Sequence, residues 1–311
     1  MKDTLSGTVL SGVGGLYAVR LPDGTSLHCR ARGVFRHEKS TVLAGDRVLV
    51  AYEENKKESG YVIDRILPRK NELPRPAVAN LDVLLIAFAV TKPEPDLLLI
   101  DKLTITALSR GIRPVILITK ADLDPEKAQD YASVYRKAGF SVLLSSRDSE
   151  DGVIGLRSLI EAGEDGLTYA FAGASGVGKS TFLNRIFPSL EQATGAISEK
   201  VARGKHTTRA VRLFETAVGE TSCYIADTPG FSMLDFVAYT DCPCEELAPL
   251  FPEFRPFLGI CRWDDCTHTK EDDCAVRAAC AEGQIAESRH KNYRVLYEEL
   301  RAMPEWKRKQ K

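Results

Sequence analysis

Residues 173–180 read Gly173-Ala174-Ser175-Gly176-Val177-Gly178-Lys179-Ser180, which fits the pattern G-x-x-x-x-G-K-S. The octapeptide follows an apolar segment of strand length, Leu167–Ala172, and a helix is expected to begin at its end. Glycines allow backbone N–H groups to turn inward around a phosphate, and the N-terminus of a helix adds the positive end of its dipole. The octapeptide therefore predicts a phosphate-binding loop in which Lys179 contacts the β- and γ-phosphates of a nucleotide and the Ser180 hydroxyl binds Mg²⁺.

A second group for this metal is expected from Asp227-Thr-Pro-Gly230, which closes the apolar stretch 222–226. Asp227 would hold Mg²⁺ through water, and the N–H of Gly230 would meet the γ-phosphate. Taken alone, Asp-Thr-Pro-Gly is also an ordinary turn. Its position downstream of a phosphate loop favours the second half of a nucleotide site.

The choice of base is predicted from Thr119-Lys120-Ala121-Asp122, which ends another apolar strand. A carboxylate at Asp122 accepts from both N1–H and the N2 amino group of guanine, a pair of bonds that adenine cannot make. The stem of Lys120 would cover the purine face. The usual guanine signature begins with Asn, and the hydroxyl of Thr119 replaces only part of that bonding. Ser145 and Ser146 end the next strand, where they would support the guanine base. A loop without contact to the nucleotide is the alternative.

A basic loop, Arg203-Gly-Lys-His206-Thr207-Thr208-Arg209, lies between these two halves of the nucleotide site. One of its threonines would close over the γ-phosphate and Mg²⁺. The spacing does not distinguish Thr207 from Thr208. We assign Thr208, together with Ser180 and Asp227, to the Mg²⁺ site. Many GTPases place Gln right after Asp-x-x-Gly to orient the attacking water, but this chain has Phe231. His206 is the nearest candidate for that role, and contact with phosphate or RNA is the alternative. The predicted catalytic residues are thus His206, Lys179, Thr207 and Thr208.

The order of these motifs is unusual, because the base-reading loop precedes the phosphate loop. Ordinary GTPases begin with the phosphate loop and read the base last. Cutting a compact domain at a surface turn and joining its old ends preserves every contact when the termini lie close together. The order therefore predicts a circularly permuted GTPase domain, in which the segment after Asp227 leads directly into the C-terminal part.

That C-terminal part contains Cys261-x₄-Cys266-x-His268-x₅-Cys274. Three thiolates and one imidazole within so short a segment make a closed tetrahedral set for one structural zinc ion. The segment is also expected to have a poor hydrophobic core, so that a bound metal would add the stability that the core lacks. Cys280 is a rival ligand, and Cys242 and Cys244 form a second candidate pair.

The apolar pattern divides the chain into three parts. Residues 1–72 are expected to form a small closed five-stranded β-barrel, because so small an open sheet would leave its edges unpaired. Three prolines then mark 68–76 as a linker. Residues 73–240 alternate strands and helices, as in a mostly parallel sheet with helices on both faces. Residues 241–311 form the metal-binding part, with a helix over 282–302 and a basic tail. The predicted strands are 8–10, 16–21, 26–30, 46–52, 61–67, 83–90, 115–119, 140–145, 167–172, 209–215 and 222–226, and the central helices are 96–109, 125–138 and 153–162.

Composition excludes several classes of protein. The net charge of −1 argues against a protein that coats nucleic acid with a uniformly basic surface. The charge is unevenly distributed, because residues 1–72 include 12 basic and 9 acidic residues and residues 241–288 include 4 basic and 11 acidic residues. The longest apolar run, 83–90, is too short to cross a membrane, and the N-terminus lacks the apolar segment of a secretory signal. We therefore expect a cytoplasmic protein that contacts no membrane and has no structural disulfides.

The motif order, the Gly204-Lys-His-Thr-Thr-Arg209 loop and the cysteine cluster together resemble the RsgA/YjeQ-like family of GTPases that depend on the small ribosomal subunit. The resemblance covers nearly the whole chain. It implies an N-terminal OB-fold, GTP hydrolysis stimulated by the small subunit, and a role in late maturation of that subunit. It also implies GTP or GDP contacts at 119–122 and 173–181, up to Thr181, and one zinc per chain.

The residues by themselves also fit an RNA partner. A small barrel with basic neighbours is a common oligonucleotide binder, and the basic stretch beside it holds Arg30, Arg32, Arg36 and Lys39. An exposed charged loop is the alternative. We expect a monomer that contacts rRNA and ribosomal proteins. Two other functions are an ATP-dependent P-loop enzyme and a zinc-containing RNA-binding protein with a non-catalytic nucleotide.

Overall fold

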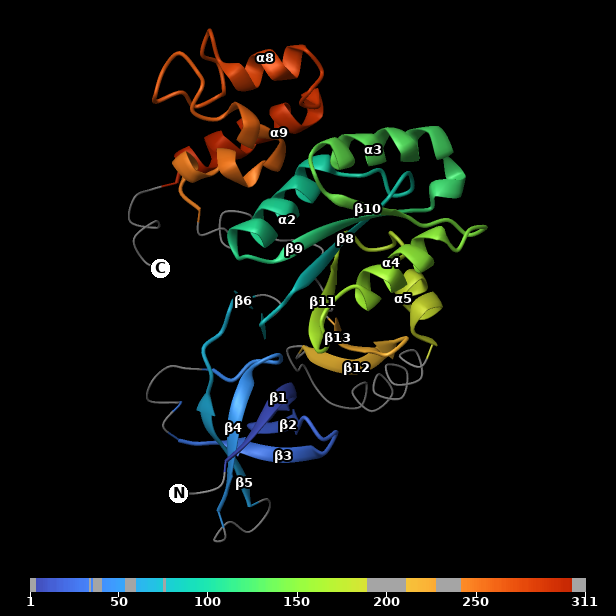
Figure 1. The fold of residues 1–311 in the computed structure, drawn as a ribbon, viewed down its shortest axis with the longest axis vertical. Helices are drawn as coiled ribbons and strands as arrows, with labels where there is room; N and C mark the ends of the chain where they lie inside the picture. The colour runs from blue at the N-terminus through green and yellow to red at the C-terminus, as the bar shows by residue number, and fades with distance from the viewer. Residues whose placement is uncertain are drawn as a thin grey trace. The chain divides into compact units, whose positions relative to one another are not determined.

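The computed structural model of the chain describes residues 4–33, 35, 41–53, 60–74, 77–188, 211–227 and 242–303. Figure 1 shows it as a ribbon with the element labels used below. The chain forms two compact units, each built from several segments. The first comprises Met1–Val83, Arg157–Phe171 and Leu183–Phe231, and the second comprises Leu84–Leu156, Ala172–Phe182 and Ser232–Lys311.

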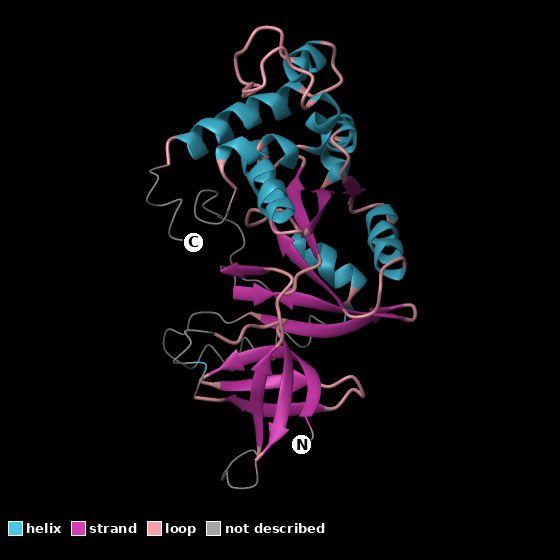
Figure 2. Cartoon of the chain, turned by 60° about the vertical axis from the view of Figure 1, so that its left-hand side comes forward, coloured by secondary structure: helices cyan, strands magenta, loops and turns pink. Residues whose placement is uncertain are grey.

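The first unit contains a closed five-stranded barrel, as predicted (Figure 2). Its strand order is β1-β2-β3-β5-β4, and an antiparallel pairing of β1 with β4 closes it. Strand β1 is longer than the predicted 8–10 because it pairs with β4 near its start and with β2 near its end. The strands are β1 (Thr4–Val13), β2 (Leu16–Arg20), β3 (Ser26–Ala31), β4 (Arg47–Tyr52) and β5 (Tyr61–Ile66). Their core includes Val9, Val19, Cys29, Val48, Val50 and Ile63.

The predicted linker is wrong over part of its length, because it contains structure. Strands β6 (Glu72–Pro74) and β7 (Ala77–Ala79) form a two-stranded antiparallel sheet. Proline is tolerated there because an edge strand leaves one row of N–H positions without a ladder partner. The segment is also held to the barrel, since Arg69 pairs with Asp46.

Asp46 is fully buried and is the centre of this attachment. Its Oδ1 accepts from Arg69 Nε at 2.7 Å, and its Oδ2 accepts from Arg69 Nη2 at 2.9 Å and from the N–H of Leu43 at 2.8 Å. Arg69 Nη2 also donates to the carbonyl of Thr41 at 2.6 Å. A buried carboxylate with this many donors is satisfied only while all of these segments stay together.

The rest of the first unit extends from the barrel through three strands: β11 (Leu167–Ala172), β12 (Arg212–Val218) and β13 (Thr221–Asp227). Strand β11 is parallel to β13, and β12 is antiparallel to β13. Strand β12 also pairs with β1 at Ser11 and Arg212.

The second unit shows the predicted alternation of strands and helices. Strands β8 (Val83–Ala89), β9 (Arg113–Thr119) and β10 (Ser141–Leu144) are neighbours in the order β10-β9-β8, and β9 and β10 are parallel. Helices α2 (Leu97–Ser109) and α3 (Pro125–Lys137) pack on β9. Helices α4 (Asp151–Glu161) and α5 (Lys179–Ile186) lie on the other face (Figure 1). Asp96 and Asp124 cap α2 and α3 by accepting from the N–H groups of Leu99 and Lys127.

The C-terminal part of this unit has a well-formed core, so the expectation of a poor one is wrong. Three short 3₁₀ helices, η2 (Cys244–Glu246), η3 (Ala248–Leu250) and η4 (Pro252–Phe257), precede α8 (Ala275–Ala281) and α9 (Glu287–Arg301). Tyr293 of α9 packs edge-on against Phe251 and Phe254, with ring centroids 5.2 and 4.9 Å apart. The sequence analysis missed these aromatic contacts because they join residues far apart in the chain.

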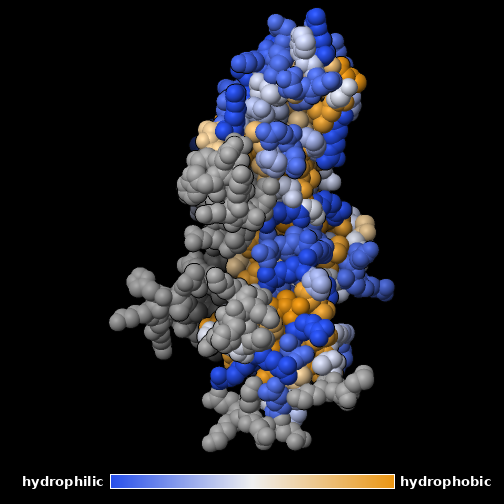
Figure 3. All heavy atoms as spheres, turned by 90° about the vertical axis from the view of Figure 1, so that its left-hand side faces the viewer, coloured by the Kyte–Doolittle hydropathy of each residue, from blue (hydrophilic) through white to orange (hydrophobic). Residues whose placement is uncertain are grey.

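The predicted helix over 282–302 is also corrected, because it begins at Glu287 and a separate helix, α8, precedes it. Gly283 between them has φ +74°, a conformation that glycine adopts without strain and that ends a helix. The upper part of the face in Figure 3 is mostly hydrophilic. Over the described residues, no helix is both long and apolar enough to cross a bilayer.

We predict that Asp46→Ala destabilises the barrel by roughly 3 kcal/mol, because it leaves the guanidinium of Arg69 without its main buried partner. Hydrogen exchange of the β1 and β4 amides would measure the loss locally. Asp23→Ala, at an exposed turn of the same barrel, should change exchange little. Equal protection in the two variants would contradict the role given to Asp46.

Candidate nucleotide and metal sites

The octapeptide forms the connection between β11 and α5, as the sequence predicts. Gly173, Gly176 and Gly178 have φ values of +133°, +77° and +97°, all in the region that favours glycine. A Cβ at Gly173 would lie 2.0 Å from the carbonyl oxygen of Ala87. The first glycine therefore permits both the turn and the close approach of the loop to β8.

Lys179 folds back over this loop. Its Nζ donates to the carbonyls of Gly173 and Ala174 at 2.8 and 2.7 Å. Burial lowers the pKa of this ammonium, because desolvation penalises its charged form. Ser180 and Thr181 are exposed in the first turn of α5. The loop thus presents a cation, two hydroxyls and a helix N-terminus to one region, which is the donor set of a phosphate site.

The base-reading loop contacts the phosphate loop directly. Thr119 is 3% exposed, and its Oγ1 lies 3.1 Å from the carbonyl of Phe88 and 2.5 Å from that of Val177. A hydroxyl has one proton, so it serves these two acceptors in turn, whereas an Asn amide would offer two donors. Thr119 therefore braces the phosphate loop, which answers the question raised by the missing Asn.

Lys120 makes the second connection. Its Nζ donates to the carbonyl of Lys92 at 2.6 Å and to that of Gly176 at 2.9 Å. The residue has φ +55°, in the left-handed region. The sequence did not predict the contacts with Lys92 and Gly176, because every residue has a backbone carbonyl and the sequence does not show which of them accepts a hydrogen bond.

Asp122 is exposed, and its loop is joined to the end of β10. Its Oδ1 accepts from the N–H of Arg147 at 3.0 Å. The N–H of Ala121 donates to the carbonyl of Ser145 at 3.1 Å. Ser145 is buried and Ser146 is half-buried, so both lie beside the base-reading loop. Arg147, whose backbone positions the carboxylate, was missed by the sequence analysis.

The γ-phosphate side of the predicted site lies mostly outside the described residues. His206, Thr207, Thr208, Phe231 and Gly230 all fall there. Asp227 ends β13, where its Cα pairs with that of Arg212. The assignments to water and Mg²⁺ remain predictions.

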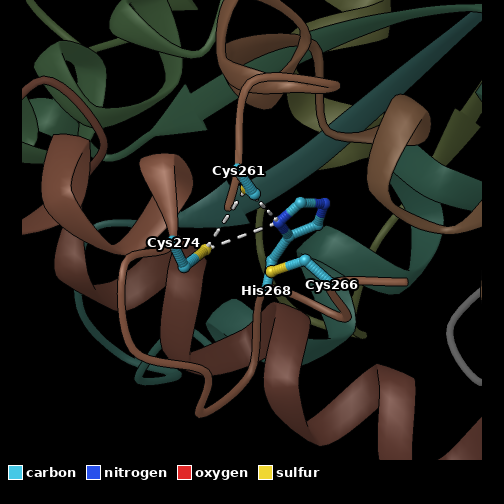
Figure 4. A group of neighbouring side chains, drawn as sticks. All are labelled: Cys261, Cys266, His268 and Cys274. Atoms are coloured by element: carbon cyan, nitrogen blue, oxygen red, sulfur yellow. Dashed lines mark hydrogen bonds between the residues drawn. The ribbon is translucent and has the colours of Figure 1, made fainter. Parts of the chain in front are cut away.

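The four predicted metal ligands form one cluster, shown in Figure 4. The sulfurs of Cys261, Cys266 and Cys274 and a ring nitrogen of His268 all lie within 4.8 Å of one another. Cys261 Sγ is 3.9 Å from Cys274 Sγ, and His268 Nδ1 is 3.6 and 3.5 Å from those two sulfurs. Among the described residues, no other group of three or more such side chains could hold a metal ion.

The three distances among Cys261, Cys274 and His268 fit zinc. A tetrahedral ion with Zn–S bonds of about 2.3 Å and Zn–N bonds of about 2.05 Å places sulfurs about 3.8 Å apart and sulfur and nitrogen about 3.6 Å apart. Burial raises the pKa of the Cys266 thiol to about 12 and lowers that of His268. The imidazole is therefore held neutral, as a ligand must be, while thiols would release protons on binding metal.

The surroundings of the cluster support its ligands. The N–H of Ala275 donates to Cys261 Sγ at 3.4 Å. Glu271 accepts from the N–H groups of Thr267, Thr269 and Lys270 at 3.0–3.1 Å, which fixes the loop around His268. Contacts of this kind orient metal ligands.

A phosphate loop that follows its base-reading loop in the chain, and is bonded to it, defines a circularly permuted P-loop GTPase. The family described as RsgA GTPase matches residues 66–237, and the RsgA N-terminal domain matches 6–62. The chain belongs to the RsgA GTPase family and is a GTP-hydrolysing enzyme.

Individual relatives agree with this assignment. The "Small ribosomal subunit biogenesis GTPase RsgA" of Ruminiclostridium cellulolyticum is 42% identical over 304 residues, covering 97% of this chain and 96% of the relative. The one from Bacillus anthracis is 40% identical over 299 residues, covering 95% and 97%. The crystal structure of YjeQ from Thermotoga maritima matches with a TM-score of 0.78 at 30% identity, covering 97% and 100%. That of YloQ, a circularly permuted GTPase, matches with a TM-score of 0.76 at 32% identity, covering 97% of each chain.

We predict that Thr119→Val weakens GDP binding by about tenfold, because two buried carbonyls lose their shared donor and the phosphate loop loses its brace. Titration of a fluorescent GDP analogue would measure this. Thr119→Ser keeps the hydroxyl and should bind nearly as the parent does. Equal affinity in the valine and serine variants would show that the hydroxyl does not brace the loop.

The metal cluster generates a second prediction. Metal analysis should find one zinc per chain, and Cys266→Ser should lower that content and destabilise residues 242–303 first, as seen by hydrogen exchange. Cys280→Ser is the matched control and should keep its zinc. Full zinc retention by serine variants of Cys261, Cys266 and Cys274 would contradict the ligand set.

Proposed function

We propose that this GTPase acts in late maturation of the small ribosomal subunit, binds its rRNA, and is stimulated by the subunit to convert GTP to GDP and phosphate. The observation that carries the nucleotide part is the bonding of Thr119 and Lys120 to the phosphate loop. The small ribosomal subunit is proposed because relatives that match almost the whole of this chain are known as small ribosomal subunit biogenesis GTPases. We further propose that the chain acts as a monomer in the cytoplasm.

Roles follow from the chemistry of each group. Asp122 reads the guanine edge, Ser145 and Ser146 flank the base, and 173–181 wraps the phosphates. Lys179 offsets the charge that develops on the transferred phosphoryl group. Ser180, Asp227 and Thr208 are the proposed residues for Mg²⁺, and Cys261, Cys266, His268 and Cys274 for a structural zinc. Mg²⁺ would provide positive charge at the phosphates, and zinc would cross-link the fold of 242–303 through its four ligands.

RNA contact is proposed for the barrel and the basic ends. Of its predicted basic stretch, Arg36 and Lys39 lie outside the described residues. Arg32 pairs with Asp64 and, at 3.1 Å, with Glu53, so its charge is already matched within the barrel. Arg30 is exposed on β3. The division into 1–72, 73–240 and 241–311 is retained as a proposal for function, because each part would have its own ligand.

Hydrolysis is proposed to be slow until the subunit binds. Phe231 cannot orient water, and the basic loop around His206 holds Arg203, Lys205 and Arg209. The like charges of these cations repel one another, and nearby rRNA phosphates would relieve that repulsion. Subunit binding would then bring a threonine to the metal side and His206 to the attacking water.

Base choice is tested with Asp122→Asn. The variant should bind GTP more weakly and favour xanthosine triphosphate, because Asn offers a donor where xanthine has an acceptor oxygen. Nucleotide competition, with ATP included, measures the preference. Asp148→Asn, an exposed site in the neighbouring loop, should keep the parent's preference. If Asp122→Asn still prefers GTP, Asp122 does not contact the base, and preference of the parent for ATP would overturn the guanine assignment.

Stimulation is tested with His206→Ala. The variant should bind GTP and small subunits nearly as the parent does, but lose most of the stimulated rate, on the order of 10²-fold. Lys205→Ala should instead weaken subunit binding, with a shallower salt dependence by about 0.7 to 0.9 in the log–log slope, and keep turnover when saturated. The rates are measured with and without purified small subunits. Undiminished turnover of His206→Ala at saturation would mean that a group of the subunit orients the water.

A further inference from the structure

Helix α9 makes polar contacts with two different sites within residues 289–293. Its His290 ring nitrogen Nε2 lies 2.8 Å from the carbonyl oxygen of His268, and its Tyr293 hydroxyl donates to the carbonyl of Thr267 at 2.7 Å. Both carbonyls belong to the metal-ligand loop seen in Figure 4. A change in the backbone of that loop therefore acts directly on α9.

The other contacts of α9 reach α2 through Asp101, which is fully buried. Arg289 Nη1 donates to Asp101 Oδ1, and Asn292 Nδ2 donates to Asp101 Oδ2 at 2.7 Å. Arg289 is 1% exposed and also donates from Nε to Glu253 at 2.7 Å. Separating a buried pair leaves an uncompensated charge, so α9 and α2 are constrained to move together.

Asp101 is also bonded to α3, because the Tyr135 hydroxyl donates to its Oδ1 at 3.2 Å. Helix α2 precedes β9, and α3 begins at Pro125, just after the base-reading loop 119–122. One carboxylate thus joins α2 to α3, the helix that follows the loop. All of these groups, with the phosphate loop, belong to the same compact unit.

We propose that α9 couples metal occupancy at the Cys261 cluster to guanine-nucleotide binding, with the Asp101 carboxylate as the joint between them. The inference rests on the proposed nucleotide and zinc sites and adds their linkage. With metal bound, the four ligands would hold the backbone at Thr267 and His268, α9 would convey that order to Asp101, and Asp101 would position α3, which follows the guanine-reading loop, against α2. Because linkage is reciprocal, nucleotide must tighten metal binding by the factor by which metal tightens nucleotide.

The test uses the full chain loaded with zinc. Its zinc affinity is measured at equilibrium by competition with a chelator, with and without saturating GDP, and GDP binding is followed separately by fluorescence. We expect GDP to raise the zinc affinity by about fivefold or more. Unchanged zinc affinity in a chain that binds GDP would overturn the coupling alone. Failure of the loaded chain to bind GDP would overturn the proposed function as well.

Two variants test the joint without burying an unpaired charge. Asn292→Ala and Tyr135→Phe each remove one hydrogen bond to Asp101, and both should reduce the GDP effect on zinc affinity toward none while each ligand still binds alone. Lys291→Ala, exposed on the same turn of α9, should keep the parent's factor. Lys102→Met breaks the partly buried pair with Glu299, 2.9 Å long, and should also keep the parent's factor, because that pair does not involve Asp101. Full coupling in both Asp101-directed variants would exclude this route.

Discussion

The hydroxyl of Thr119 is the interaction on which the nucleotide site depends. It lies between the carbonyls of Phe88 and Val177. It therefore connects the end of β9, where Thr119 lies, to the end of β8 and to the phosphate loop. Gly173 makes this approach possible, because any side chain there would collide with the carbonyl of Ala87. Once these backbone segments are in contact, the positions of Lys120, Asp122 and Lys179 follow.

This constraint explains how a permuted chain order supports a GTPase. The groups that brace the loop are backbone carbonyls, the Thr119 hydroxyl and the Lys120 ammonium, and none of them depends on which segment comes first along the chain. Permutation therefore alters connectivity while the hydrogen bonds persist. What it adds is proximity in sequence between Asp227 and the C-terminal part, so that loss of the γ-phosphate could affect the segment that leads to the metal cluster.

The C-terminal part illustrates a different balance of forces. Its aromatic core around Phe251, Phe254 and Tyr293 buries apolar surface, and Cys274 lies in the same core. The cluster of Cys261, Cys266, His268 and Cys274 instead organises the long connection between η4 and α8, where regular structure is absent over the described residues. A buried Arg289, with carboxylates on two other elements, then joins this core to α2. The core, the metal loop and the ion pair thus act through different forces, which are burial of apolar surface, ligation and charge pairing.

The sequence by itself determined the features that depend on local chemistry. Glycine spacing around Lys179, the acidic end of the Thr119–Asp122 stretch and the close spacing of four metal ligands predicted sites that the structure assembles, because the residues of each lie within a few positions of one another. Apolar periodicity likewise predicted the strands of the barrel and the alternation of the second unit.

Only the tertiary structure decided the contacts between distant segments. The pairing of Asp46 with Arg69, the meeting of Thr119 with Val177 and the burial of Arg289 against Asp101 each join residues that no local pattern relates. The same reason accounts for the errors at 68–76 and 282–302, where pairing partners and a left-handed glycine set the element boundaries. Local propensity contributes little compared with such contacts, because a buried polar group must have a hydrogen-bond partner in place of water. These partners come from distant segments and are in position only when the chain is folded.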